Sequence, residues 1–343
     1  MEKIGILTGG GDCPGLNAVI RAVVRRSHAL GYGILGIRNG WAGLIHGDVV
    51  PLTEFSIVGI LPRGGTILGT SRTNPFKHVE HVQKLKSNWQ KYGLDYLVVV
   101  GGEDTLGVAH RLCKQEGYPI VGVPKTIDND LAGTDYTFGF DTAVQIVTEA
   151  IDRLHTTAES HKRVMVVEVM GRHSGWIATH SGMAGGADCI LVPERKFSLD
   201  EVCALIRKRI DRGREFAIVV VAEGAAPDEN HQPITKGGHV DEFGHVQLGG
   251  VGDWLGRQIE QKTGIETRVT VLGHVQRGGT PTAYDRVLAT RFGLRAIELI
   301  RERRFGYMAS LRGTEIVGVP IEEALGQKLL DPKVFDDASV FFG

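Results

Sequence analysis

The chain has 343 residues, of which 42% are apolar and 23% charged, and its formal net charge is -1. This length suits about two domains of ~100–200 residues, and the near-neutral charge gives no reason to expect nucleic acid or an anionic membrane as the main partner. Glycine, at 47 residues, is about twice as frequent as the usual ~7% but follows no three-residue period, which excludes a collagen-like chain.

Short apolar stretches rich in Val and Ile recur along the chain without alternating with polar residues. This pattern is typical of strands buried on both faces of a parallel sheet. Strands are expected at 4–7, 34–37, 97–100, 120–123, 164–169, 190–192, 217–222 and 268–272. Helices are expected at 17–26, 79–92, 142–155, 199–212 and 252–263. The alternation predicts an α/β protein with helices on both faces of its sheets.

Other features bound the structure and its location. Residues 225–250, with two prolines and several glycines, are expected to form a surface hairpin. The four cysteines, Cys13, Cys113, Cys189 and Cys203, form no C-x-x-C pair, so neither a zinc site nor a disulfide framework is indicated. No signal peptide or membrane span is evident, and a cytoplasmic location is expected.

Glycines follow the first predicted strand, in T-G-G-G-D-C-P-G at 8–15. Adjacent glycines leave backbone N–H groups unobstructed, and Pro14 opens the helix behind them. Such a turn suits a phosphate group. The string matches neither G-x-G-x-x-G nor a Walker loop, so a plain tight turn is the alternative.

Two acidic residues, Glu103 and Asp104, follow another predicted strand, in G-G-E-D-T at 101–105. Adjacent carboxylates repel each other and are best tolerated beside a cation. Mg²⁺ held by one carboxylate and by phosphate oxygens is the natural candidate. The alternative is a helix N-terminus, which favours acidic side chains.

The segment K-T-I-D-N-D at 125–130 follows the next strand. A hydroxyl that attacks phosphorus must lose its proton, and the Asp128 carboxylate at a strand end is a plausible acceptor. Thr126 is expected on the same side of the extended chain, and Lys125 is placed to neutralise phosphate charge. A structural Asx-turn is the alternative, although three consecutive polar side chains exceed what that turn needs.

Six arginines also stand out in the sequence, several of them beside glycines. They are Arg63, Arg72, Arg163, Arg172, Arg268 and Arg277. Singly, each is expected to be a solvated surface residue. Together, and with His274 three residues from Arg277, they suit phosphate binding, because the guanidinium group matches phosphate oxygens. The motifs combined predict phosphoryl transfer and leave the substrate open.

These motifs, in this order, resemble the phosphofructokinase family over nearly the whole chain. The strings are T-G-G-G-D-C-P-G-L-N-A-V-I-R at 8–21, R-G-G-T-I-L-G-T-S-R at 63–72, G-G-E-D-T at 101–105, P-K-T-I-D-N-D at 124–130, V-E-V-M-G-R-H at 167–173, A-E-G at 222–224 and L-G-H-V-Q-R-G-G at 272–279. The glycines at 9–11, 64–65, 101–102 and 278–279 lie within them and are expected to allow close approach to phosphate.

The resemblance implies two doubly wound three-layer α/β domains with the active site in the cleft between them. A phosphoryl-donor domain is expected to hold residues 1–140 and 252–305. A fructose 6-phosphate domain is expected to hold residues 141–251 and 306–343.

The resemblance also implies roles for individual residues. The donor-phosphate site would hold Gly10, Gly11, Arg72, Asp104 and Lys125, and Glu103 occupies the place of the Mg²⁺ carboxylate. Asp128 corresponds to the base for the 1-hydroxyl of fructose 6-phosphate, with Thr126, Arg172, Lys125 and Asp104 as further catalytic residues. The sugar-phosphate site would hold Thr126, Asp128, Asp130, Arg163, Met170, Gly171, Arg172, Glu223, Arg268, His274 and Arg277. Arg163 and Arg268 resemble residues that reach a neighbouring subunit, which implies a homodimer or homotetramer.

Two positions bear on the phosphoryl donor. Typical ATP-using relatives have glycine where this chain has Asp104 and Lys125. A carboxylate at 104 places bulk and negative charge where the α-phosphate of a nucleotide must pass, and that repulsion is costly in a low-dielectric cleft. Lys125 adds a cation for pyrophosphate. The pair resembles the pyrophosphate-dependent branch of the family, which implies a reversible reaction of glycolysis or gluconeogenesis.

Regulation and alternatives complete the prediction. Regulated relatives bind anionic effectors with several arginines, and Glu54 and His155 stand here where arginine is expected, so weak or absent allosteric control is predicted. The first alternative is an ATP-dependent 6-phosphofructokinase that tolerates Asp104. A more remote one is a non-catalytic sugar-phosphate sensor, which would not need Thr126, Asp128, Glu103 and Arg172 together.

Overall fold

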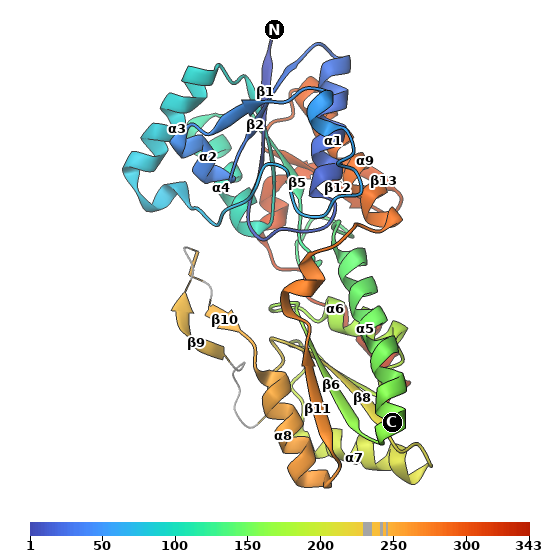
Figure 1. Ribbon diagram of the computed structural model, residues 1–343. Helices are drawn as coiled ribbons and strands as arrows, with labels where there is room; N and C mark the ends of the chain where they lie inside the picture. Colours follow the sequence, from blue (N-terminus) through green and yellow to red (C-terminus); the bar gives the residue numbers. More distant parts are fainter. Residues whose placement is uncertain (229–234, 241–242, 245) are drawn as a thin grey trace.

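The computed structural model describes residues 1–228, 235–240, 243–244 and 246–343. Figure 1 shows two α/β parts, each built on its own sheet. The larger sheet has the order β13-β12-β5-β4-β1-β2-β3, and the smaller has the order β11-β6-β8-β7. This arrangement confirms the predicted fold class.

The larger sheet consists of β1 (Lys3–Thr8), β2 (Gly33–Ile37), β3 (Val49–Pro51), β4 (Tyr96–Gly101), β5 (Ile120–Pro124), β12 (Tyr307–Arg312) and β13 (Glu315–Pro320). Its five inner strands are parallel, whereas the edge strands β3 and β13 are antiparallel to their neighbours. Every residue of β4 and β5 is buried. Full burial of a Val, Leu or Ile side chain stabilises the fold by about 1.5–3 kcal/mol, so these central strands supply much of the core.

Helices cover both faces of the larger sheet. They are α1 (Leu16–Ala29), α2 (Trp41–His46), α3 (Val79–Tyr92), α4 (Glu103–Glu116) and α9 (Ala283–Arg301), with the short 3-10 helices η1 (Phe55–Ile57), η2 (Pro75–Lys77) and η4 (Ile321–Leu325) beside them. Ile4 and Ile6 of β1 pack toward α1 and α9, while Leu7 packs toward α2, α3 and α4. This alternation along one strand produces the three layers.

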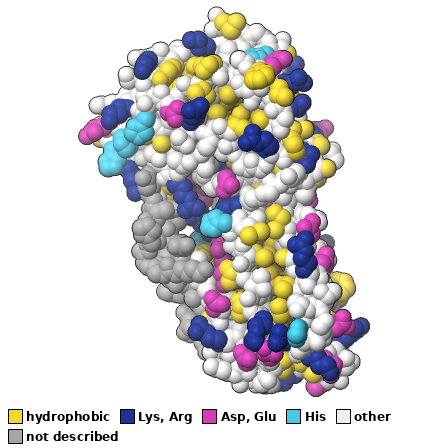
Figure 2. Space-filling model, in the orientation of Figure 1, with side chains coloured by type: hydrophobic (Ala, Val, Ile, Leu, Met, Phe, Trp, Pro, Cys, Tyr) yellow, Lys and Arg dark blue, Asp and Glu magenta, His cyan; other side chains and the backbone are white. Residues whose placement is uncertain are grey.

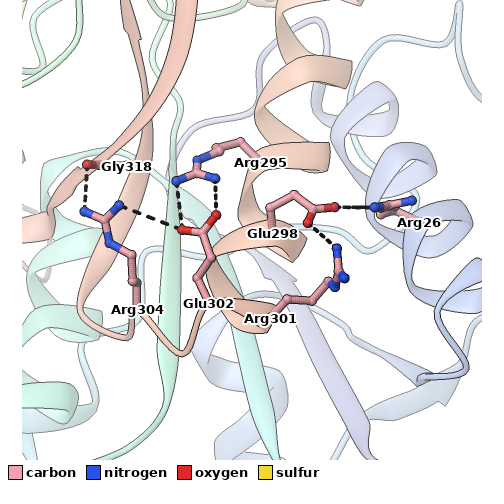
Figure 3. Close-up of polar contacts among 7 residues, drawn as sticks. All are labelled: Arg26, Arg295, Glu298, Arg301, Glu302, Arg304 and Gly318. Carbon is pink, nitrogen blue, oxygen red and sulfur yellow. Dashed lines mark hydrogen bonds and ion pairs between the residues drawn. The ribbon is translucent and has the colours of Figure 1, made fainter.

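One ion pair joins helices α1 and α9, and further pairs lie along α9 and the residue after it (Figure 3). Arg26 donates from Nε and Nη2 to Glu298 Oε1, at 2.8 and 2.6 Å. Arg295 forms a two-pronged pair with Glu302, at 2.6 and 3.0 Å. These groups are partly exposed, and such pairs contribute about 0.2–1 kcal/mol each. The apolar contacts beneath them therefore dominate this helix packing.

The smaller sheet is parallel throughout and is likewise covered on both faces. Its strands are β6 (Val164–Val169), β7 (Cys189–Leu191), β8 (Ala217–Ala222) and β11 (Thr267–Val271), and its helices are α5 (Phe140–His161), α6 (Trp176–Ala184), α7 (Leu199–Asp211), α8 (Val251–Thr263) and α10 (Pro332–Ser339). Side chains of α5 and α6 share one core cluster with this sheet, and those of α7 and α8 share another. All eight predicted strands and five predicted helices are confirmed, with ends shifted by a few residues.

The predicted hairpin is confirmed over its described residues. Strand β9 (Thr235–Val240) pairs antiparallel with β10 (Val246–Leu248). Residues 229–234, 241–242 and 245 of the predicted segment lie outside the described residues. Among the helices that the structure describes, none is both long and apolar enough to cross a membrane.

The predicted domain boundaries were wrong for two segments. Residues 252–271, expected with the first sheet, form α8 and β11, and β11 pairs with β6 in the smaller sheet. Residues 307–320, expected with the second sheet, form β12 and β13, which extend the larger sheet beside β5. The physical reason is that a strand–helix pattern does not specify which sheet it joins, because that choice depends on contacts between distant segments.

The chain consequently passes between the two parts three times (Figure 1). The first crossing, residues 125–139, connects β5 to α5; the second, 272–282, connects β11 to α9; and the third, 321–331, connects β13 to α10. The second crossing contains the 3-10 helix η3 (Gly273–Arg277). All three segments converge where the two parts meet.

Candidate active site

A cavity of about 480 Å³ lies between the two parts of the molecule. It is lined by Gly10, Gly11, Arg72, Gly102, Glu103, Asp104, Thr105, Lys125, Thr126, Asp128, Asp130, Met170, Arg172, Glu223, Phe243, Leu248, His274 and Arg277. Most of these residues follow the carboxyl ends of β1, β4, β5, β6, β8 and β11, where ligands of open α/β sheets bind. Figure 2 shows acidic, basic and histidine side chains gathered where the two parts of the molecule meet.

The glycine turn after β1 forms one wall of the cavity. Gly10 has φ +80°, a conformation that favours glycine. A Cβ atom at Gly11 would lie 2.6 Å from Nη1 of Arg277, so bare backbone there lets Arg277 approach. Lys125 donates a hydrogen bond from Nζ to the Gly11 carbonyl oxygen. The turn therefore brings two cations to a wall made of backbone.

The acidic pair lies at the N-terminus of α4, beside the glycine turn. Glu103 is the first residue of this helix and Asp104 the second, and both line the cavity. The helix N-terminus favours acidic side chains. The acidic pair therefore meets both expectations: it lies at a helix N-terminus and it lines the cavity. Mg²⁺ is commonly held by one or two carboxylates and by substrate phosphates, and this donor set fits that ion.

Lys125 is a buried cation in the same wall. Its side chain is only 4% exposed, and burial together with the nearby Arg277 lowers its pKa to about 8. The carboxylates of Asp128 and Asp12 act in the opposite direction and favour the charged form. The ammonium is thus held where an anionic ligand would restore the charge balance.

Asp128 lies in the first crossing and lines the cavity. It is 7% exposed, and its Oδ1 atom is buried without a hydrogen-bond partner among the described residues. Burial, and then the neighbouring Asp130, raise the pKa of Asp128 to about 6, against the lowering effect of Arg277, Arg172 and Lys125. A buried acceptor atom left unpaired is costly, so this carboxylate keeps an unused capacity to accept a hydrogen bond.

The loop after β6 presents Arg172 in an unusual conformation. Arg172 has φ +55° and Gly171 has φ +142°, and such backbone conformations cluster at functional sites. The Arg172 backbone N–H donates to Glu223 Oε1 at 3.3 Å. Burial and the nearby Asp128 raise the pKa of Glu223 to about 7. The loop is thereby fixed to the end of β8.

The structure brings most of the predicted site residues together, but not all of them. Gly171 does not line the cavity, although its neighbours Met170 and Arg172 do. Arg163 and Arg268 lie at the amino ends of β6 and β11, away from the cavity, where both contact Glu266. The separation between Arg163 Nε and Glu266 Oε2 is 2.6 Å. A role for these two arginines in a neighbouring subunit stays a prediction.

Gly102, one of the glycines expected near phosphate, lines the cavity, and three further lining residues were not predicted. Thr105 lies inside the G-G-E-D-T string, so the motif itself held the signal for it. Phe243 and Leu248 come from the hairpin region, where no sequence pattern indicated a cavity.

The strand ends of the two sheets bring together arginines, a lysine, a pair of carboxylates and the buried Asp128 carboxylate with its unpaired Oδ1. This combination is typical of a phosphotransferase site. The family model described as phosphofructokinase matches residues 3–300. The chain belongs to the phosphofructokinase family.

Three relatives illustrate the likeness. The chain is 60% identical to a "Pyrophosphate--fructose 6-phosphate 1-phosphotransferase" of Streptomyces coelicolor, over 99% of this chain and 100% of that one. It is 54% identical to "ATP-dependent 6-phosphofructokinase 3" of the same organism, over 94% of each. The structure of phosphofructokinase from Saccharomyces cerevisiae superimposes with a TM-score of 0.82 at 33% identity, covering 95% of this chain and 45% of the yeast chain.

Proposed function

We propose that this protein transfers a phosphoryl group from pyrophosphate to the 1-hydroxyl of fructose 6-phosphate, forming fructose 1,6-bisphosphate and phosphate. The name of the 60% identical Streptomyces coelicolor relative supports this reaction. The presence of Asp104 and Lys125 in one wall of the cavity supports pyrophosphate as the donor, because the acid disfavours a nucleotide and the cation favours a small anion. The bonds exchanged are of similar energy, so the reaction runs in both directions.

The observation that carries this proposal is the buried carboxylate of Asp128, which lines the cavity and has no hydrogen-bond partner at Oδ1 among the described residues. The carboxylate accepts the proton of the sugar 1-hydroxyl as the hydroxyl oxygen attacks the nearer phosphorus of pyrophosphate. The new P–O bond forms while the bond to the bridging oxygen breaks, and phosphate leaves with that electron pair. The proton is thereafter on Asp128 and passes to solvent when the products leave.

Charged groups around Asp128 stabilise the transferring phosphoryl group and hold the two ligands. Lys125, with Arg72, Asp104 and the Gly10–Gly11 backbone, forms the donor-phosphate site. Arg172 lies near Asp128 and balances negative charge that develops on the phosphoryl oxygens. The sugar-phosphate site consists of Thr126, Asp130, Met170, Glu223, His274 and Arg277, and Gly171 shapes the loop between Met170 and Arg172 without lining the cavity.

We infer that Mg²⁺ binds at Glu103, with Asp104 beside it. When bound, the ion supplies positive charge to the donor phosphates and helps to orient them. Among the described residues no cluster of three or more His, Cys, Asp or Glu side chains is placed to hold a metal, which suits an ion whose remaining ligands are phosphate oxygens and water.

We also propose that the protein works as a homodimer or homotetramer in the cytoplasm. Arg163 and Arg268 do not line the cavity that contains Asp128 in their own chain. In an oligomer they would instead contribute to the corresponding cavity of a second copy. The four cysteines, which form no disulfide, suit a reducing compartment. Size-exclusion chromatography with light scattering tests the assembly, and Arg163→Ala should raise KM for fructose 6-phosphate if the assembly shares its sites.

The decisive experiment assays the purified protein with fructose 6-phosphate and Mg²⁺, supplying pyrophosphate or ATP as donor. We expect kcat/KM to be higher with pyrophosphate. Equal or faster turnover with ATP would favour the second candidate, an ATP-dependent enzyme. The name of the 54% identical relative supports that candidate. No turnover with either donor would favour the sugar-phosphate sensor.

A further inference from the structure

Lys328 lies in the third crossing between the two parts, and its side chain contacts the first crossing. Its Nζ donates to Asn129 Oδ1 at 3.0 Å, to the Thr134 carbonyl at 3.0 Å and to the Asp135 carbonyl at 2.8 Å. An ammonium group has three hydrogens, so all of its donors are directed at one loop. The Lys328 backbone N–H adds a fourth bond, to the Asp130 carbonyl at 2.7 Å.

Asn129, the residue that Lys328 contacts through its side chain, lies between two residues of the cavity. It is fully buried and has φ +52°, whereas its neighbours Asp128 and Asp130 line the cavity. A left-handed residue between them fixes the direction in which each carboxylate points. The Asn129 side chain is absent from the lining, so its contacts stabilise the turn from behind.

A second contact extends this support to Thr126. Asn129 Oδ1 also accepts from the Thr137 backbone N–H at 3.1 Å, and Thr137 Oγ1 donates to the Thr126 carbonyl at 2.8 Å. Lys328, Asn129 and Thr137 therefore form a chain of hydrogen bonds that spans residues 126–130. The stretch that contains Asp128 is held at both ends.

The other side of Lys328 is attached to the smaller part of the molecule. Trp176 Nε1 in α6 donates to the Lys328 carbonyl at 3.3 Å, and Lys328 Nζ lies 5.4 Å from the centroid of the Trp176 ring. Burial lowers the pKa of Lys328 to about 8, while Asp135 and Asp130 oppose that shift. A cation in a partly buried position is costly unless its hydrogen bonds are satisfied, as they are here.

We propose that Lys328 is a positioning residue for phosphoryl transfer, which fixes the 126–130 turn so that Asp128 faces the acceptor hydroxyl. It does not line the cavity, so it acts through Asn129 and the backbone rather than on substrate. The inference rests on the proposed function, because it presumes that Asp128 is the base. It implies that losing the ammonium misplaces Asp128 while leaving in place the main part of the donor wall, which is the glycine turn after β1 and the N-terminus of α4.

The test replaces Lys328 with Met, which matches the length of the uncharged part of the lysine side chain and lacks the ammonium. We expect kcat to fall about 10- to 100-fold, as for a misplacement of the reacting group by about 1 Å, while KM for pyrophosphate changes by less than about threefold. Lys333→Met is the matched control, since Lys333 is an exposed lysine on α10, and it should keep wild-type kcat. Thermal melts and circular dichroism establish that each variant is folded at the assay temperature.

A double-mutant cycle with Asn129→Gly separates positioning from a purely structural role. Glycine tolerates the positive φ and removes only the amide, so Lys328→Met should cost far less in that background if both act through one contact. Additive losses, or a Lys328→Met enzyme with kcat within about twofold of wild type, would overturn the proposal. If Lys328→Met does not fold, Asn129→Gly and Thr137→Val carry the test, and full kcat in both overturns it.

Failure of the proposed function gives a different result. An Asp128→Asn variant with full turnover removes Asp128 as the base, whatever Lys328→Met does. A wild-type enzyme that prefers ATP changes the donor, and the Lys328 comparison then uses ATP with the same expected loss. Wild-type preference for pyrophosphate and an inactive Asp128→Asn, together with full activity of Lys328→Met, overturns only the positioning role.

Discussion

The two walls of the cavity are built in different ways. The wall from the larger sheet consists mainly of the glycine turn after β1 and the N-terminus of α4, where backbone groups are exposed. The wall from the smaller sheet consists mainly of side chains, among them Met170, Arg172 and His274. A small symmetric anion such as pyrophosphate suits the first wall, whereas a sugar phosphate with several distinct hydroxyls suits the second.

This difference predicts which changes matter on each side. A wall of backbone is sensitive to any added side-chain atom, while a wall of side chains is sensitive to their removal. Arg277 connects the two, because it comes from the second crossing and lies against Gly11 of the glycine turn. Asp128, Asp130 and Lys125 come from the first crossing and also face both walls.

The largest effect is expected from the residue between the walls. Asp128→Asn removes the proton acceptor with little change in size, and kcat should fall about 10²–10⁴-fold, the usual contribution of a general base. KM for pyrophosphate should change little, since the donor wall is intact. Steady-state assays in both reaction directions measure this, with Asp211→Asn, an exposed carboxylate on α7, as the control. Asp128→Asn with wild-type kcat would remove the base from the mechanism.

A single methyl group should disrupt the contact between the walls. Gly11→Ala places a Cβ atom 2.6 Å from Arg277 Nη1, so the guanidinium must move. We expect kcat/KM to fall by roughly 10- to 100-fold for both substrates, because Arg277 faces the acceptor and Gly11 the donor. Gly278→Ala is the control, since the nearest atom to its added Cβ would be 3.9 Å away. Equal activity of the two variants would show that Arg277 needs no close approach to the turn.

Much of the fold could be predicted because its signals are local. The strands at 97–100 and 120–123 are short non-polar stretches rich in Val, and both are buried on two faces as expected. The site could be predicted where motif and strand end coincide, as for Glu103, Lys125 and Asp128. A local pattern of this kind carries its own structural context.

The rest depended on contacts between distant segments. Of the four glycine groups expected near phosphate, those at 64–65 and 278–279 do not line the cavity. A Cβ atom at Gly64 would lie 2.2 Å from the Gly279 carbonyl oxygen, so these two pairs allow backbone to meet backbone. The sheet joined by β11 and the support of Asn129 by Lys328, 199 residues away in sequence, were equally hidden for this reason.

A moderate effect, on donor choice, is expected at the backbone wall. Asp104→Gly removes a carboxylate from the N-terminus of α4 and should raise kcat/KM with ATP about tenfold relative to pyrophosphate, equivalent to about 1.4 kcal/mol. Asp104→Asn separates charge from bulk, because it removes only the charge. Parallel assays with both donors give the ratio. An unchanged ratio in both variants would mean that donor choice resides elsewhere in the cavity.

The smallest effect near neutral pH is expected from titration of the two groups that face both walls. Asp128 must be deprotonated to act, and its pKa is raised to about 6, so kcat/KM should fall as pH decreases through that value. Lys125 must be protonated to hold the donor, and its pKa is lowered to about 8, so kcat/KM for pyrophosphate should fall as pH increases through that value. The profile is therefore bell-shaped, with about half of the maximum remaining at each limb's midpoint. Lys125→Arg keeps the positive charge at all these pH values and should abolish the alkaline limb alone, whereas an alkaline limb that persists in this variant would assign it to another group.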